Sequence, residues 1–225
     1  MKPSISTPAS KASRRQKGCS RVITIVDYGR GNLYSVQKAL GRLKFSARIS
    51  ADPQDLLDSD GVILPGVGAF GDAMLQLRKA GLDETLWELS KRGTPLLGIC
   101  LGMQLLFTES EENGLHRGLN LLPGTVRRLP QGVKIPHVGW NELRFVQPHP
   151  LFYGLNEGHV YFVHSYYAEV ANQEDLLATT DYGGNIAALV GRHSVFGMQF
   201  HPEKSGDLGL QLLQNFARMC EKETV

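Results

Sequence analysis

The chain has 225 residues, of which 42% are hydrophobic and 20% are charged, an ordinary balance for a globular protein with one substantial core. No stretch has the length of unbroken apolar sequence that a membrane span needs. The formal charge is +2, but residues 1–26 hold six basic residues and no acid, so 18 basic and 22 acidic residues remain elsewhere. A mildly acidic body gives no electrostatic footprint for nucleic acid. We therefore expect neither a membrane nor a nucleic acid as a partner.

Residues 1–21 are rich in Ser, Lys and Arg. This composition predicts a disordered basic extension, although it is also typical of an organelle targeting peptide. We expect the folded domain over residues 22–225. The three cysteines, Cys19, Cys100 and Cys220, form no spaced framework, and their odd number favours reduced thiols in the cytoplasm.

Short apolar runs alternate with helical patterns in the first half of the chain. The predicted strands are VITIV (22–26), FSARI (45–49), GVILP (61–65) and TPLLGIC (94–100). Apolar residues recur at helical spacing between them, and the last run leads directly into LGMQLLF (101–107), which we expect to be helical. Asp52 and Pro53 predict the start of a short helix. This alternation indicates a parallel sheet covered by helices on both faces.

Strand-like runs dominate the second half, separated by Gly, Pro and Asn turns. They are LLPGTVRRL (121–129), VGWNELRFV (138–146), HVYFVHSYYAEV (159–170), DLLATT (175–180) and IAALVGRHSVFGMQF (186–200). Only residues 207–220 carry a clear helical stripe of apolar residues. The predicted fold class is α/β, a three-layer domain with a mostly parallel sheet, extended by antiparallel strands and closed by a C-terminal helix.

Residues 98–102, GICLG, have the pattern of a nucleophile on a sharp strand-to-helix turn. Such a turn is strained and needs small residues on both sides. It would place the Cys100 thiol at a helix N-terminus, where the dipole favours the thiolate, and would aim the Leu101 N–H at an oxyanion. The alternative is a buried structural cysteine. The flanking glycines favour a nucleophile.

Among seven histidines, His201 follows an apolar strand and precedes Pro202 and Glu203. Functional residues collect at strand ends in α/β sheets. The two-residue spacing lets Glu203 hold the far nitrogen of the imidazole, as a third member of a catalytic triad does. A surface turn, or a metal site that uses both residues, are the alternatives. No third ligand stands at a recognisable spacing for a metal.

Residues 66–71, GVGAFG, satisfy the G-x-G-x-x-G pattern of dinucleotide sites. The motif follows the third predicted strand instead of the first, and Pro65 interrupts the passage from strand to turn. The nearby acids Asp83 and Glu84 look like helix-start residues. A glycine loop can also turn backbone N–H groups toward an oxyanion, which is the interpretation we favour.

The motifs DYGRGN, PGVGAF, GICLGMQLLF, YFVHSYY and FGMQFHPEKS resemble those of the class I (triad) glutamine amidotransferases, from about Val22 to the C-terminus. Within PGVG, Val67 favours the glutaminase subunits of imidazole glycerol phosphate synthase, and KIPHVGWN (134–141) adds to that choice. The resemblance implies a glutaminase without a cofactor or a metal. Its partner would be a HisF-type (β/α)8-barrel cyclase that uses ammonia in histidine biosynthesis.

The resemblance also implies roles for individual residues. The triad would be Cys100, His201 and Glu203, and the oxyanion donors would be the N–H groups of Val67 and Leu101. The glutamine-binding set would be Gly68, Gln104, Glu112, His164, Ser165 and Tyr166, although Gln104 and Glu112 by themselves look like solvated helix surface. The interface with the cyclase would include Asn32, Trp140, Tyr161 and Lys204.

Asn32 could instead cap a helix, and Trp140 and Tyr161 could be core aromatics. The basic extension departs from the family pattern. Two other functions stay open: the glutaminase subunit of another amidotransferase, serving anthranilate, nucleotide or pyridoxal phosphate synthesis, and a non-catalytic module with the same fold.

Overall fold

The computed structural model describes residues 21–221, so the predicted basic extension lies almost wholly outside the described residues. The main sheet has nine strands, in the order β2-β1-β3-β4-β13-β12-β11-β8-β9. Its first five strands are mutually parallel. They are β2 (Ser46–Ser50), β1 (Val22–Val26), β3 (Gly61–Gly66), β4 (Leu96–Cys100) and β13 (Val195–Met198). This half confirms the predicted parallel sheet.

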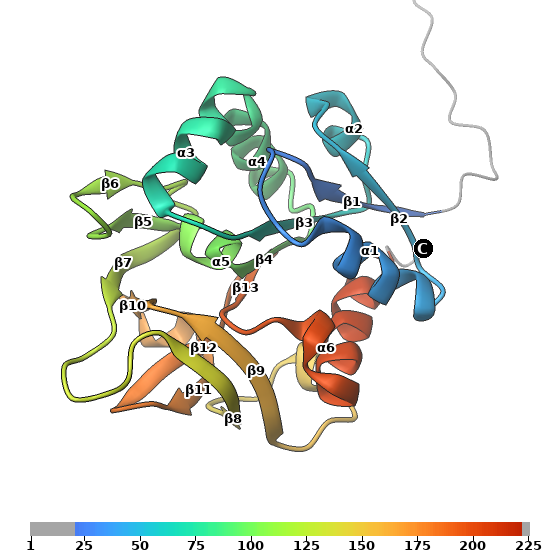
Figure 1. The fold of residues 1–225 in the computed structure, drawn as a ribbon. Coiled ribbons are helices and arrows are strands. Elements are labelled where there is room, and N and C mark those ends of the chain that lie inside the picture. Colours follow the sequence, from blue (N-terminus) through green and yellow to red (C-terminus); the bar gives the residue numbers. More distant parts are fainter. Residues whose placement is uncertain (1–20, 222–225) are drawn as a thin grey trace, which may run out of the picture.

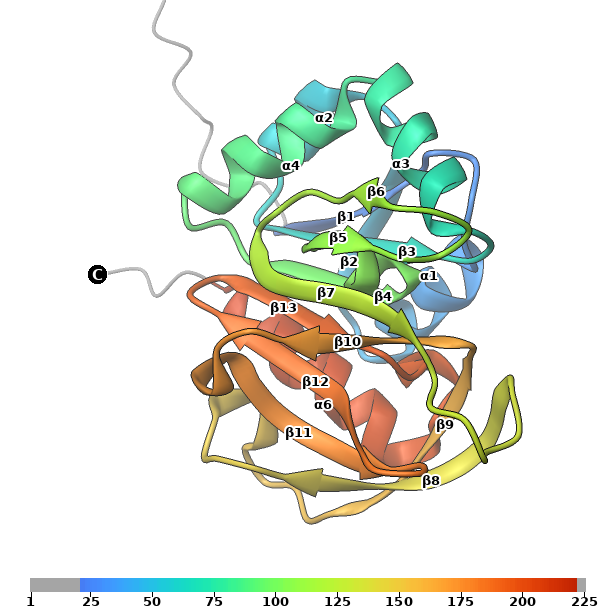
Figure 2. The same ribbon diagram turned by 90° about the vertical axis from the view of Figure 1, so that its left-hand side faces the viewer.

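The other four strands of the main sheet pair antiparallel. They are β12 (Asn185–Arg192), β11 (Leu176–Asp181), β8 (His137–Phe145) and β9 (Gly158–His164). A second sheet has the order β10-β7-β5-β6, and Figure 2 brings it to the front. It comprises β10 (Tyr166–Val170), β7 (Leu122–Arg128), β5 (Phe107–Ser110) and β6 (His116–Arg117).

Helices cover both faces of the parallel half (Figure 1). They are α1 (Leu33–Arg42), α2 (Pro53–Leu57), α3 (Phe70–Lys79), α4 (Leu82–Lys91), α5 (Leu101–Leu105) and α6 (Gly206–Met219), with short 3-10 turns at Pro150–Phe152, Gln173–Asp175 and Pro202–Lys204. The predicted start of α2 is confirmed, because the Asp52 side chain accepts from Gln54 N and Pro53 occupies the first turn. None of the described helices is long and apolar enough to cross a membrane.

Successive side chains of β3 point to opposite faces of the sheet, and each face has its own hydrophobic core. Ile63 packs in the core that contains α1 and α6, including Leu40 and Phe216. Its neighbours Val62 and Leu64 pack in the opposite core, with α2, α3, α4 and the second sheet. Because side chains alternate across a strand, the fully buried strand β3 contributes residues to both cores. The three-layer α/β class predicted from the sequence is confirmed.

Three sequence-based assignments need correction. The run 159–170 is two strands in different sheets, with β9 in the main sheet and β10 in the second. The helix expected over residues 101–107 ends at Leu105, and Phe107 already opens β5. The run 186–200 is two strands, β12 and β13, joined at a turn where His193 has φ 53°. The end of α5 lies inside continuously buried sequence, so apolar content alone could not reveal it. The turn at residues 192–194 is polar and only partly buried, and that polarity was the available signal.

Candidate active site

Cys100 stands at the junction between β4 and α5. Its backbone has φ 56° and ψ −113°, a region that non-glycine residues rarely occupy. Its side chain is 7% exposed, and the sulfur lies 3.7 Å from the carbonyl oxygen of Val163 on β9. Such strain persists only where the surrounding structure enforces it, and it is common at functional sites.

The glycines on either side of Cys100 are sterically required. A Cβ at Gly102 would lie 1.7 Å from the Leu64 carbonyl oxygen, and one at Gly98 would lie 2.5 Å from the Gly102 carbonyl oxygen. The turn therefore folds back against β3 more closely than any side chain allows. This is the physical reason for the G-x-C-x-G pattern in the sequence.

His201 follows β13, which is hydrogen-bonded to β4, so the sheet carries His201 and Cys100 to the same edge. Its Nδ1 lies 3.0 Å from Oε1 of Glu203, and both side chains are nearly inaccessible. The carboxylate can only accept, so Nδ1 carries the proton. The other ring nitrogen, Nε2, is buried and has no hydrogen-bond partner within residues 21–221.

Opposing effects act on the pKa of His201. Burial lowers it, but hydrogen bonding and the charges of Cys100 and Glu203 outweigh burial and raise the pKa to about 9. An imidazolium is thus favoured at neutral pH, beside a thiol whose ionised form it would stabilise. A metal at His201 and Glu203 lacks support, because no group of three or more His, Cys, Asp or Glu side chains in the described chain could hold one.

Cys100 and His201 line one cavity of about 310 Å³. Its walls include every residue predicted to form the oxyanion hole or bind substrate: Val67, Gly68, Leu101, Gln104, Glu112, His164, Ser165 and Tyr166. Pro136 and Val163 complete the lining. Glu203 lies behind His201. The volume suits a small polar molecule such as an amino acid.

The glycine loop that resembled a dinucleotide motif contributes Val67 and Gly68 to the cavity wall. Gly68 has φ +98°, and a Cβ there would approach Arg30 Nη1 to 3.0 Å. Arg30 also lies 3.8 Å from Asp72 on α3. The loop therefore faces the thiol from β3 and is held by the DYGRGN segment.

Gln104 and Glu112 are not solvated helix surface. Gln104 is 4% exposed, and its Nε2 donates to the Tyr166 carbonyl at 2.9 Å and to Gln199 Oε1 at 3.0 Å. Glu112 lies beyond α5, and its Oε2 accepts from the Phe70 N–H at 2.7 Å. Both side chains are fixed by the protein while they face the cavity.

Sequence reasoning overlooked two residues beside the thiol. Gln199 is fully buried, and its Nε2 points to the Cys100 sulfur at 3.9 Å. The hydroxyl of Tyr28 is buried without a partner among the described residues, and a Cβ on Gly66 would approach that oxygen to 2.6 Å. Burial, and then the charge of Cys100, raise the pKa of Tyr28 above its usual range. Their positions within the DYGRGN and FGMQFHPE motifs were the available signal.

The four residues assigned to a partner interface lie outside the cavity. Trp140 and Tyr161 face each other across β8 and β9, with ring centroids 6.0 Å apart, and Trp140 is 53% exposed, so it is not a core aromatic. Lys204 is exposed next to Glu203. Asn32 precedes α1 without a side-chain cap, and its Nδ2 donates to Glu203 Oε1 at 3.5 Å.

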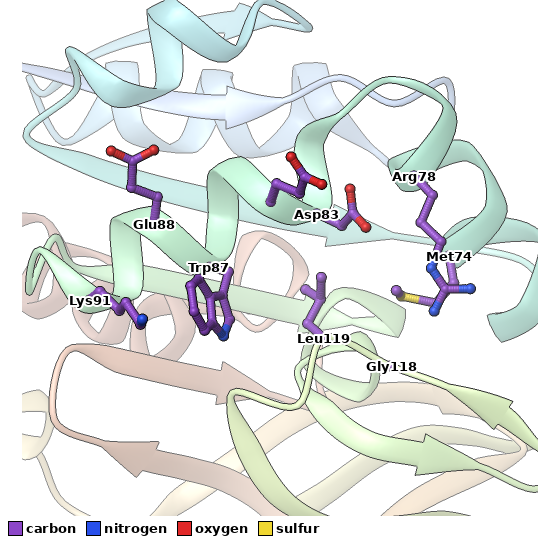
Figure 3. Close-up of a pocket in the computed structure, with 9 residues that line it drawn as sticks. Met74, Arg78, Asp83, Trp87, Glu88, Lys91, Gly118 and Leu119 are labelled. Atoms are coloured by element: carbon purple, nitrogen blue, oxygen red, sulfur yellow. The ribbon is translucent and has the colours of Figure 1, made fainter.

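A larger cavity, of about 590 Å³, lies elsewhere, between α3, α4 and the segment before β7 (Figure 3). Trp87, Lys91 and Arg78 line it, with Lys91 Nζ 3.6 Å from the centre of the Trp87 ring. It shares no residue with the Cys100 cavity. The volume of a cavity alone would therefore not lead to the Cys100 cavity.

The fold is a three-layer α/β domain, and its site combines a strained cysteine, a buried histidine and a carboxylate. This combination is typical of a cysteine-dependent amidotransferase. Residues 24–220 match the family described as "Glutamine amidotransferase class-I", and the chain belongs to this family. It is an enzyme of the glutamine amidotransferase class.

Curated relatives are similar over nearly the whole chain and are named "Imidazole glycerol phosphate synthase subunit HisH". The protein from Geobacillus sp. (strain WCH70) is 55% identical over 207 residues, which cover 89% of this chain and 98% of that protein. The Moorella thermoacetica protein is 53% identical, covering 88% and 95%. The Halalkalibacterium halodurans protein is 52% identical, covering 89% and 97%.

Solved structures share the fold at lower identity. "Crystal structure of glutamine amidotransferase" aligns with a TM-score of 0.71 and 22% identity, covering 88% of this chain and 98% of that one. "Structure of PurLQS from Thermotoga maritima" gives 0.69 and 19%, covering 89% and 99%. These likenesses support the fold class.

Proposed function

We propose that this chain is the glutaminase subunit of imidazole glycerol phosphate synthase and that Cys100, His201 and Glu203 form its catalytic triad. The observation that carries the proposal is the single cavity on which the strained Cys100, the buried His201 and all the predicted glutamine-binding residues converge. The identity of 55% to a HisH subunit supports the choice within the family.

In the first half-reaction, the Cys100 thiolate attacks the side-chain amide carbon of glutamine. The tetrahedral oxyanion forms between the backbone N–H groups of Leu101 and Val67, which both line the cavity. His201 then gives the proton on Nε2 to the amide nitrogen. The C–N bond breaks, ammonia leaves, and a γ-glutamyl thioester remains on Cys100.

In the second half-reaction, neutral His201 takes a proton from water as the water oxygen attacks the thioester carbon. The C–S bond breaks, and glutamate and the Cys100 thiolate are released, with the proton again on His201. Glu203 keeps Nδ1 as a donor throughout, so Nε2 alone exchanges protons. The cycle needs no redox partner.

The ammonia would pass to a HisF-type (β/α)8-barrel cyclase docked beside Trp140, Tyr161 and Lys204. There it would react with a phosphoribulosyl formimino-carboxamide nucleotide, and the products would be imidazole glycerol phosphate and an aminoimidazole carboxamide nucleotide. The exposure of Trp140 supports this docking position, because a half-exposed indole on a strand pair is typical of an interface anchor.

The test is glutamate release by the purified chain, alone and mixed with a HisF-type cyclase and its nucleotide substrate. We expect strong stimulation in the mixture and none with Cys100→Ala. A glutamine-analogue electrophile should label wild-type protein at Cys100 in the same mixture. Absence of stimulation would contradict the cyclase partnership. Absence of labelling would favour a non-catalytic module instead.

A further inference from the structure

Two histidines on neighbouring strands form a buried pair beside the proposed glutamine cavity. His137 on β8 and His164 on β9 are cross-strand partners, and His137 Nδ1 lies 3.1 Å from His164 Nε2. They are 1% and 6% exposed. His164 lines the cavity, and His137 lies behind it.

The outer nitrogens of the pair both face oxygen acceptors. His164 Nδ1 lies 2.8 Å from the Tyr166 carbonyl oxygen, and His137 Nε2 lies 3.2 Å from Asn141 Oδ1. The Asn141 amide is fixed in this orientation, because its Nδ2 donates to the Asp181 carbonyl at 2.9 Å. Neither acceptor can supply a proton, so each outer ring nitrogen must carry one.

The contact between His137 Nδ1 and His164 Nε2 then determines how many protons the two rings carry together. The two facing nitrogens share one proton, since one must donate and the other accept. Together with the two outer protons this makes three, whereas two neutral imidazoles carry only two. The hydrogen-bond pattern is therefore complete only when the pair is a neutral imidazole bound to an imidazolium.

Burial opposes a charge on either ring, and the hydrogen-bond pattern opposes two neutral rings; of the two, His137 is the better place for the extra proton. Burial lowers the pKa of His164 to about 4; its bond to Tyr166 opposes this, and charge on His137 and His201 lowers it further. Burial also lowers the pKa of His137, opposed by the Asn141 bond. The His137 ring is stacked on Tyr182, with centroids 3.7 Å apart, and on Phe162, at 4.9 Å. Two aromatic faces attract a cation.

Glutamine brings both an α-ammonium and an α-carboxylate into the cavity. Glu112 supplies a carboxylate for the ammonium, but no Lys or Arg side chain is among the residues that line the walls. His201 is committed to Cys100 and Glu203. The titratable groups that face the histidine pair are Tyr182, stacked on His137, and His201, whose charge acts on His164. Arg30 lies beside Gly68 of the lining, so Arg30 and the histidine pair are the remaining sources of positive charge near the cavity.

We propose that the His137–His164 pair holds one extra proton and that its positive charge helps the cavity to select the α-carboxylate of glutamine. The proposal rests on the proposed glutaminase function and adds a specificity determinant to it. Neither imidazole touches the reacting amide, so the pair acts on substrate binding and orientation. Both ring nitrogens of His164 face protein atoms, so the charge acts on the substrate through space, across the His164 ring that lines the cavity.

Asn141 allows a sharp test, because it lies outside the cavity. Asn141→Leu removes one acceptor, so two protons satisfy the remaining contacts and the pair should be neutral at pH 7. Asn141→Asp keeps the acceptor and the charge. Nitrogen-15 NMR of histidine-labelled full-length chain, titrated over pH, reads the protonation of each ring without turnover. We expect one imidazolium in wild type and in Asn141→Asp, and none in Asn141→Leu.

A kinetic experiment measures glutaminase activity of each variant in the presence of the cyclase. It compares two substrates, glutamine and its α-carboxamide, which lacks the carboxylate charge. Asn141→Leu should raise the KM for glutamine about tenfold, leave kcat within about twofold and erase the preference for glutamine over the α-carboxamide. Asn141→Asp should keep the imidazolium but weaken the preference, because its carboxylate offsets the positive charge of the pair. Two neutral rings in wild type at pH 7, or an unchanged preference in Asn141→Leu, would overturn the proposal. A charged pair in a wild-type chain that releases no glutamate would overturn the glutaminase function alone.

Discussion

Nδ1 of His201 donates to Oε1 of Glu203 across 3.0 Å, and the Glu203 side chain is only 1% exposed. The two residues are separated by Pro202 at the start of a 3-10 turn, so the sequence spacing itself fixes the contact. The bond leaves Nε2 as the nitrogen available to Cys100. It also makes the protonation of His201 depend on one buried carboxylate.

Replacing Glu203 with Gln should slow glutamate release by about 100- to 10,000-fold. Without the carboxylate charge, burial would lower the pKa of His201 from about 9, and the imidazolium needed by the departing ammonia would be scarce at neutral pH. The measurement is kcat against pH with the cyclase present. Glu88→Gln, at an exposed ion pair on α4, is the matched control and should match wild type. A Glu203→Gln profile like that of wild type would contradict the triad.

The stability of the folded chain should also fall at alkaline pH, because the interactions that raise the pKa of His201 stabilise only its protonated form. The folded-state pKa of His201, about 9, is above the unfolded value of 6.5, so its contribution is fully present below pH 6.5 and is lost as pH rises through about 9. Urea unfolding at pH 6 and at pH 9.5 measures the difference. We expect a smaller difference in His201→Asn, and an equal one would show that other groups cause the loss.

The nucleophile turn and the strand-end histidine could be predicted because each depends on local sequence. GICLG encodes its own geometry, and His201 follows directly from a buried strand. The resemblance placed Gln104 in the glutamine-binding set, but its local sequence alone predicts solvated helix surface, because its partners Tyr166 and Gln199 lie 62 and 95 residues away. Its burial follows from the packing of the second sheet, which no helical pattern encodes.

Gly102→Ala should prevent stable folding or displace α5, because the new methyl group would lie 1.7 Å from the Leu64 carbonyl oxygen. Backbone cannot yield as a flexible side chain does. Gly41→Ala is the matched control: nothing lies within 4 Å of its Cβ position in helix α1, and removing a helical glycine should stabilise the chain by about 0.5–1 kcal/mol. Thermal unfolding of both variants checks this pair. Equal, mild effects would refute the close approach.

Gln199→Met should slow alkylation of Cys100 without unfolding the chain. The Gln199 amide lies 3.9 Å from the sulfur and accepts from Gln104, so its loss removes a donor that favours the thiolate and frees the Gln104 side chain. Iodoacetamide labelling at neutral pH should be slower than in wild type, while the thermal unfolding temperature stays unchanged. Gln211→Met, on α6 and away from the cavity, should leave the rate unchanged. An unaltered labelling rate for Gln199→Met would exclude this role.

Trp140→Ala should weaken cyclase binding about 30-fold or more, because exposed aromatic side chains are the usual anchors of an interface. Trp87→Ala is a closely matched control. The two indoles are 53% and 49% exposed, so truncation should change the stability of the isolated chain to a similar, small extent. Trp87, however, belongs to the larger cavity beside Lys91 (Figure 3). Trp140 belongs to the β8–β9 strand pair near the proposed active site. Calorimetric titration with the cyclase separates them: equal affinity losses would mean that the partner covers α4 instead of, or as well as, the β8–β9 surface.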